Sequence, residues 1–299
     1  MSSSSWNFAQ GEPISARLTA VELLGGGSAY EAYLAFDHLL YAPVVVKVVR
    51  PDQIHDSSTL AGLERETDMV GELAHPSIVR GFHAVLDGDR PHLVLENLDG
   101  PRLSSLVRRH GPMPPQQLLP LGLELASALH YLSERDVVHL DVKPANIIMG
   151  APPRLIDLSV ARSSGEAAAL TTTIGTDAWM APEQCHPPTS GSPGFASDVW
   201  GLGASLFYAA AGFRPFPRDV DDHRDTGNAA EQPLQHPQLS LPHAPLPDRV
   251  EPSLRKVIEA CLVPDPAQRP LPAEIAGMLE PMLAALPRPR LAGFKVSMR

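Results

Sequence analysis

The most informative stretch of this sequence is His139-Leu140-Asp141-Val142-Lys143-Pro144-Ala145-Asn146. It brings a carboxylate, an ammonium group and a carboxamide close together, after residues 116–133 in which leucines recur at helical spacing. Further along the chain come Asp157 and then Ala181-Pro182-Glu183. The aspartate and the asparagine taken alone could be turn residues, but their spacing with Lys143 and Asp157 favours a functional site.

Two upstream segments extend this pattern. Residues 24–30 read Leu-Gly-Gly-Gly-Ser-Ala-Tyr, and residues 44–49 form a β-branched run with Lys47 inside it. A lone strand lysine usually extends its charge to solvent, and a glycine-rich loop alone is weak evidence, but five motifs in this order are specific. From about residue 17 to about residue 287 the chain resembles a protein kinase domain, and is most similar to bacterial serine/threonine kinases of the eukaryotic (Hanks) type.

This resemblance implies an α+β fold of two lobes. A small β-rich N-lobe with one long helix would sit on a mainly helical C-lobe, with ATP bound between them. Residues 57–73 carry an apolar stripe and are the expected N-lobe helix. The expected divisions of the chain are a flexible N-terminus at 1–16, the N-lobe at 17–97, the C-lobe at 98–287 and a short tail at 288–299.

The resemblance also assigns the steps of phosphoryl transfer to particular side chains. Asp141 is expected to accept or orient the proton of a substrate hydroxyl, and Lys143 to neutralise charge on the transferring phosphate. Asp157 and Asn146 are expected to hold Mg²⁺, or Mn²⁺ in its place, because oxygen ligands suit a hard cation. Lys47 would pair with the α- and β-phosphates of ATP.

Three further residues are expected to support these groups. A glutamate of the N-lobe helix should pair with the strand lysine; Glu66 is the first choice and Glu64 the second, although such an acidic helix face could also be solvated charge. Asp198 matches the aspartate that orders the catalytic loop in the family. Arg269 is expected to pair with Glu183.

The nucleotide site is expected to consist of backbone and apolar groups. Glycines let backbone N–H groups approach a phosphate, because no Cβ intrudes. The family usually has valine and alanine where this chain has Ala32 and Val45, so the total volume is about unchanged and we expect an intact adenine pocket. Leu95 would be the gatekeeper. The predicted nucleotide contacts are Gly25, Gly26, Gly27, Ala32, Val45, Lys47, Glu66, Leu95, Glu96 and Leu98.

The chain departs from the family at three positions. Leu140 replaces the arginine that normally binds a phosphorylated activation-loop residue, so we hypothesise that activity depends little on phosphorylation at Thr171–Thr173 or that another cation is used. Ser159 replaces the glycine of the metal-binding turn. Tyr30 stands at the third glycine of the loop, where it could cover the phosphates or stack on the lobe.

Two other functions are weighed against a protein serine/threonine kinase. A pseudokinase would bind nucleotide and partners without efficient turnover, and the three departures favour it. Retention of Lys47, Asp141 and Asp157 favours turnover, because these groups perform the transfer. A small-molecule kinase is disfavoured by Lys143 and by the complete Ala181-Pro182-Glu183 segment.

Composition excludes several other classes. The 299 residues carry 24 basic and 34 acidic side chains, a net charge of −10, which argues against nucleic-acid binding. Two cysteines provide neither a disulfide framework nor a zinc site. The chain has no apolar run long enough for a membrane span and no secretory signal at its start. We therefore expect a cytoplasmic protein with protein substrates, no nucleic-acid or membrane partner, and self-association as a route to autophosphorylation.

Overall fold

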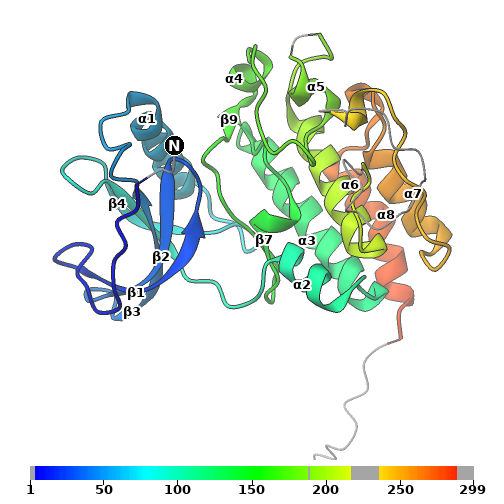
Figure 1. The fold of residues 1–299 in the computed structure, drawn as a ribbon. Coiled ribbons are helices and arrows are strands. Elements are labelled where there is room, and N and C mark those ends of the chain that lie inside the picture. The colour runs from blue at the N-terminus through cyan, green and yellow to red at the C-terminus, as the bar shows by residue number, and fades with distance from the viewer. Residues whose placement is uncertain (1–3, 188, 217–235, 288–299) are drawn as a thin grey trace, which may run out of the picture.

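The computed structural model describes residues 4–187, 189–216 and 236–287. Two lobes lie side by side in Figure 1, a sheet-based lobe in blue and cyan and a helical lobe in green to red. This mixed α+β architecture confirms the expected fold class. The C-terminal tail expected at 288–299 lies outside the described residues.

The N-lobe is an antiparallel five-stranded sheet with one helix beside it. The strand order is β1-β2-β3-β5-β4. Along β2 and β3, buried and half-buried side chains alternate, as expected for a sheet covered on both faces to different extents. The strands are β1 (Leu18–Gly26), β2 (Tyr30–Asp37), β3 (Ala42–Val49), β4 (Gly81–Val85) and β5 (His92–Glu96).

Helix α1 (Ser57–Glu72) is the predicted N-lobe helix. The side chain of Asp56 caps its first turn by accepting a hydrogen bond from the Thr59 amide at 2.7 Å. The helix buries Leu63 and Val70 against the sheet, and on the same inner side it buries Glu66. A buried carboxylate requires a cation, so the position of α1 decides where that cation must be.

The C-lobe is built around α6, a helix that is buried on nearly every side. A helix that is apolar all round belongs in the centre of a lobe, and α3 and α7 both pack against it. Within the described residues, no helix is long and apolar enough to cross a membrane. The main helices are α2 (Leu103–His110), α3 (Pro115–Glu134), α6 (Phe195–Ala211), α7 (Pro252–Cys261) and α8 (Pro272–Ala285).

Short elements connect the larger helices of the C-lobe, and several are only one turn or two residues long. Most of them lie in or directly beside the catalytic-loop segment or the activation segment, which runs from Asp157 to Glu183. They are β6 (Val137–Val138), η1 (Pro144–Asn146), β7 (Ile147–Ile148), β8 (Arg154–Leu155), β9 (Arg162–Ser163), α4 (Ser164–Ala168), α5 (Pro182–Cys185), η2 (Pro237–Leu239) and η3 (Pro266–Gln268).

The N-terminal segment differs from the flexible chain expected at 1–16. From Ser4 onward it packs along the sheet, with Phe8 and Ile14 buried in the same apolar cluster as the strand residues. The Trp6 indole N–H donates to the Val49 carbonyl at 2.8 Å. The expectation rested on the polar character of the segment as a whole, but its few apolar side chains are enough to anchor it because each buries a large area.

Candidate active site

The catalytic-loop segment 139–146 is held by the amino end of helix α6. The amides of His139 and Leu140 donate to the two carboxylate oxygens of Asp198, at 2.7 and 2.8 Å. Burial raises the pKa of Asp198 to about 7, while the two amide bonds act in the opposite direction. Leu140 has φ = 64°, an uncommon conformation for leucine. Asp198 therefore stabilises a strained turn directly before Asp141.

His139 has a supporting position in this loop. Its side chain is fully buried, and Nε2 lies 3.3 Å from the Ile156 carbonyl. Burial lowers its pKa below the usual value, which favours the neutral ring. A buried neutral imidazole bonded to backbone packs the loop rather than exchanging protons with a substrate.

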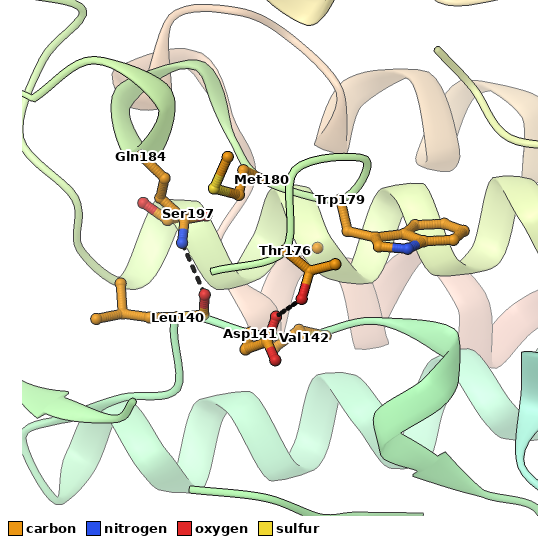
Figure 2. Close-up of a pocket in the computed structure, with 9 residues that line it drawn as sticks. Leu140, Asp141, Val142, Thr176, Trp179, Met180, Gln184 and Ser197 are labelled. Carbon is orange, nitrogen blue, oxygen red and sulfur yellow. Dashed lines mark hydrogen bonds between the residues drawn. The ribbon is translucent and has the colours of Figure 1, made fainter. Parts of the chain in front are cut away.

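Asp141 lies at the centre of a cluster of polar side chains, of which Figure 2 shows Thr176. Thr176 Oγ1 donates to Asp141 Oδ1 at 2.8 Å, and Lys143 Nζ lies 2.6 Å from Asp141 Oδ2. Lys143 also donates to Thr176 Oγ1. Asn146 Nδ2 donates to both the carbonyl and Oδ2 of Asp141, each at 3.0 Å. These bonds hold the carboxylate in one orientation, in which it can accept a proton from a hydroxyl.

The second cluster joins the two lobes through Lys47. Its Nζ lies 2.6 Å from Glu66 Oε2 on α1 and 2.9 Å from Asp157 Oδ1. Burial lowers the pKa of Lys47, but the two carboxylates outweigh it and raise the pKa above its usual value. Although burial acts to raise the pKa of Asp157, Lys47 holds it well below its usual range. Lys47 and Asp157 therefore stabilise each other's charged forms.

Asp157 and Asn146 provide oxygen atoms that fit a divalent cation. Both bonds from Asn146 to Asp141 use Nδ2 and neither uses Oδ1. Asp157 has φ = 69°, so its side chain leaves the chain at a sharp turn. Among the described residues no three His, Cys, Asp or Glu side chains form a metal-binding group. A hard cation such as Mg²⁺ commonly uses only one or two protein ligands together with phosphate oxygens and water, so the donor set fits.

The glycine-rich turn between β1 and β2 is shaped by two of its three glycines. Gly25 has φ = 138°, a conformation that side chains disfavour. A Cβ on Gly26 would lie 2.5 Å from the Tyr30 carbonyl oxygen. Gly27 has open space around it, and its amide donates to the same carbonyl at 3.0 Å. The turn is therefore tight at its base and open around Gly27.

The predicted adenine contacts lie on one half-buried face of the sheet and at its end. In the β2–β3 register Ala32 pairs with Lys47, and Val45 pairs with Leu34. The alternation of the strands places Ala32, Val45 and Lys47 on the same face. On β5, Leu95 pairs with Val45. Leu98, just after β5, packs against the main core.

The side chain of Glu96 is engaged by two arginines. Its carboxylate is 8% exposed and is bound by Arg80 at 3.2 Å and by Arg154 at 2.9 Å. Because both oxygens are engaged by arginines, the carboxylate is not available to a base. Arg154 also donates to the Ile78 carbonyl, so these bonds brace the connection between the lobes.

Residues 18–278 match the protein kinase domain family. The chain belongs to this family. It is 35% identical over 215 residues to the serine/threonine-protein kinase PknB of Mycobacterium leprae, covering 69% of this chain and 34% of that protein. It is 27% identical over 264 residues to the serine/threonine-protein kinase PrkC of Bacillus subtilis, covering 87% of this chain and 39% of that protein.

A third relative extends the same comparison. The serine/threonine-protein kinase PkaA of Streptomyces coelicolor is 32% identical over 243 residues, covering 78% of this chain and 42% of that protein. The chain thus spans about a third of the length of the PknB proteins that it matches. The comparisons therefore establish a protein kinase domain. The rest of each relative lies outside the matched region.

Two polar residues of this kinase domain were absent from the expected site. Thr176 donates to Asp141, and buried Gln184 donates to the Leu140 carbonyl at 2.7 Å (Figure 2). The sequence pattern singled out the threonines at 171–173 instead, which are exposed. Thr176 and Gln184 lie just before and just after Ala181-Pro182, which is the sequence signal for them. Their position along the chain does not indicate which side chain turns inward.

Leu140 lies in a small apolar cluster of the C-lobe. It is 2% exposed, and packs in a cluster with Val138 and Ala167, which half-buried Leu170 and Ile174 extend. Ala167 belongs to α4, and Leu170 and Ile174 belong to the activation segment that follows it. At the position where the family's arginine would meet a phosphate, this chain makes apolar contacts with the segment itself.

The end of the activation segment is tied to the rest of the C-lobe by a buried ion pair. Arg269 Nη1 and Nη2 donate to the two oxygens of Glu183 at 2.7 and 2.9 Å, and both side chains are 0% exposed. Ser197 Oγ also donates to Glu183. This is the pairing expected from the sequence, and breaking such a pair typically costs about 3–5 kcal/mol.

Proposed function

We propose that this chain is a serine/threonine protein kinase that transfers the γ-phosphate of ATP to protein hydroxyls. The observation that carries the proposal is the joint presence of two ordered ion clusters, Lys47 with Glu66 and Asp157, and Asp141 with Lys143. Phosphoryl transfer requires positioning and charge stabilisation above all, and these clusters supply both.

In the proposed reaction, the substrate hydroxyl oxygen attacks the γ-phosphorus as the bond from that phosphorus to the β-γ bridging oxygen breaks. The hydroxyl proton passes to Asp141, whose orientation Thr176 and Asn146 maintain. ADP leaves with the electron pair of the broken bond. Lys143 faces the transferring phosphate, and Lys47 pairs with the α- and β-phosphates while Glu66 holds its ammonium group.

The site also supports a divalent cation, which we propose to be Mg²⁺, with Mn²⁺ as an alternative. Asp157 and Asn146 would hold it, and when bound it supplies neutralisation of phosphate charge. The nucleotide would lie between the glycine-rich turn and the connection between the lobes near Glu96. The residues around it would be Gly25, Gly26, Gly27, Ala32, Val45, Leu95, Glu96 and Leu98.

The His-Leu-Asp form of the catalytic loop supports a second part of the proposal. Leu140 packs against the activation segment instead of offering a cation to it. We propose that apolar packing orders the segment, and that phosphorylation at Thr171, Thr172 or Thr173 is not required for activity. This is the reason that the loss of the arginine does not by itself indicate a pseudokinase.

The wider setting of the kinase is proposed on less local grounds. Lobe boundaries at 17–97 and 98–287 agree with β5 ending at Glu96 and α2 beginning at Leu103. The absence of a disulfide at the buried Cys185 and Cys261 and the need for ATP support the cytoplasm. Protein substrates and self-association for autophosphorylation follow from the same activity.

The test is phosphate incorporation from labelled ATP with Mg²⁺ or Mn²⁺, into the protein itself and into a basic protein acceptor. We expect label on serine or threonine in the wild type and none in Asp141→Asn, which keeps the shape of the side chain but removes the base. Saturable ATP binding without any label in the wild type would overturn the proposal and favour a pseudokinase. Label on a small molecule alone would favour a small-molecule kinase.

A further inference from the structure

Tyr30 occupies the third position of the glycine-rich pattern, and its side chain turns away from the tip of the turn. It is the first residue of β2. Its hydroxyl donates to the Thr59 carbonyl in the first turn of α1 at 2.7 Å. The side chain therefore connects the sheet to the helix instead of covering the phosphate site.

The ring of Tyr30 also contacts the lysine of the nucleotide site. Lys47 Nζ lies 4.7 Å from the centre of the ring. A cation over an aromatic face is attracted to it, and more strongly where solvent is scarce. Lys47 is thus held on three sides, by Glu66, by Asp157 and by this ring.

Helix α1 is shaped to receive the tyrosine. Gly62 is buried one turn after Thr59, and a Cβ at Gly62 would lie 2.8 Å from the Tyr30 hydroxyl oxygen. Glycine in a helix interior is unfavourable relative to alanine. Glycine at position 62 therefore leaves the room that the Tyr30 hydroxyl occupies.

We propose that Tyr30 is a positioning residue that holds Lys47 and helix α1 in the arrangement in which Lys47 meets Glu66. The inference rests on the proposed kinase function. Hydroxyl and ring act on different parts of the pair, because the hydroxyl anchors the helix that carries Glu66 and the ring faces the ammonium group of Lys47. Burial raises the pKa of Tyr30, so the hydroxyl stays protonated and remains a donor.

The sharpest test compares two glycine substitutions in the same helix. Gly62→Ala introduces a methyl group against the Tyr30 hydroxyl, whereas Gly71→Ala places one in open space on the exposed side of α1. Both changes raise the intrinsic helix propensity, and the melting temperature of each variant is measured so that a loss of kcat is separated from a loss of folding. We expect Gly62→Ala to reduce kcat roughly tenfold, the loss expected for one displaced hydrogen bond and cation contact, and Gly71→Ala to leave it unchanged.

A double variant shows whether the effect passes through the hydroxyl. Tyr30→Phe removes that hydroxyl and keeps the ring over Lys47, so we expect a reduction in kcat of a few-fold, with KM for the protein acceptor unchanged. Adding Gly62→Ala to Tyr30→Phe should cost little more, because the clash is gone. Tyr30→Leu removes both contacts and should give the largest loss. Equal effects of Gly62→Ala in the two backgrounds, or equal effects of Gly62→Ala and Gly71→Ala, would overturn the proposal.

The failure of this inference can be told apart from the failure of the proposed function. ATP binding with Mg²⁺ by titration calorimetry needs no turnover. If the wild type binds ATP but transfers no phosphate, the kinase proposal fails. In that case Tyr30→Leu should still weaken ATP binding several-fold while Gly71→Ala does not, and unchanged binding in Tyr30→Leu would contradict the positioning role.

Discussion

At the scale of single residues, the hydroxyl of Thr176 determines how Asp141 and Lys143 meet. It accepts from Lys143 Nζ and donates to Asp141 Oδ1, so one oxygen bridges two oppositely charged side chains. Lys143 Nζ also meets Asp141 Oδ2 directly at 2.6 Å, so the hydroxyl adds a second, indirect link that fixes the orientation of the pair. Misplacement of a reacting group by about 1 Å can reduce a rate by roughly a hundredfold.

We therefore predict that Thr176→Val lowers kcat by about a hundredfold and leaves ATP affinity nearly unchanged. Thr176→Ser keeps the hydroxyl and should retain most of the activity. Steady-state phosphate transfer checks the first part and calorimetry the second. A valine variant with wild-type kcat would mean that Asp141 is oriented by Asn146 and Lys143 alone.

At the scale of elements, the activation segment is held by several contacts in which no phosphate takes part. Leu140 packs with Leu170 and Ile174 on the segment, Thr173 Oγ1 donates to the Cys185 carbonyl, and Gln184 bonds the loop at Leu140. Thr171 and Thr172 are exposed. The segment is therefore anchored on both sides of the threonine run.

We predict that replacing Thr171, Thr172 and Thr173 together by alanine retains at least about a third of the activity, because the lost Thr173 bond is one neutral hydrogen bond. Leu140→Ala should reduce activity more than the triple change, since it removes buried side-chain contacts that order the segment. Phosphate transfer is measured for both variants, and mass spectrometry shows whether the wild type carries phosphate on these threonines. Near-complete loss in the triple variant would contradict the proposed independence from phosphorylation.

The buried carboxylate of Asp37, at the end of β2, joins several neighbouring segments of the N-lobe. Its oxygens accept from Arg17, from the amides of Leu39 and Leu40, and from His83. Burial alone would raise the pKa of Asp37, but these bonds hold it well below its usual range. Because the carboxylate is favoured in the folded state, the folded state binds fewer protons than the unfolded chain near pH 3–4.

The stability that Asp37 contributes is thus present above the unfolded pKa of about 4 and is lost as the pH falls below it. We predict that wild type and Asp37→Asn differ most in free energy of unfolding above about pH 5, and that the difference shrinks toward pH 3. Chemical denaturation across this range measures it, with Glu22→Gln on the exposed part of β1 as the control. A constant difference across the range would mean that the charge of Asp37 has no part in it.

At the scale of the whole molecule, the N-terminal segment is an additional layer on the sheet. Trp6 and Phe8 stack on each other, Arg90 lies over both rings, and its guanidinium also donates to the Pro13 and Ile14 carbonyls. The same segment reaches the glycine-rich turn, because Arg50 donates to the carbonyls of Ser4 and Gly27. Packing at one end of the chain thus supports the nucleotide site.

We predict that Phe8→Ala lowers the melting temperature by roughly 6–20 °C, since truncating a buried phenylalanine costs about 3–5 kcal/mol and each kcal/mol shifts a domain of this size by about 2–4 °C. Gln10→Ala, at an exposed position of the same segment, is the matched control and should have no effect. Calorimetric melting checks both. A freely moving N-terminus would make Phe8→Ala as neutral as the control.

The order of the motifs was sufficient to predict the fold class, the Lys47 to Glu66 pairing and the Glu183 to Arg269 pairing. Such predictions succeed where a residue type is needed at one place and few alternatives exist. A choice between Glu66 and Glu64 already depended on the phase of α1, which buries Glu66. The N-terminal segment was misjudged because its anchors are only three side chains, Trp6, Phe8 and Ile14, in a polar stretch.

The sequence by itself determined which chemical groups this protein has and their order along the chain, because the catalytic loop is local and its spacing is visible in one segment. Only the tertiary structure decided that Thr176 lies on Asp141, that Leu140 packs on the activation segment, and that Tyr30 turns toward α1. Each of these contacts joins residues about 30 positions or more apart, and its geometry depends on how helices and sheet pack. Side-chain direction at such positions is set by the space that the neighbours leave, which no local pattern records.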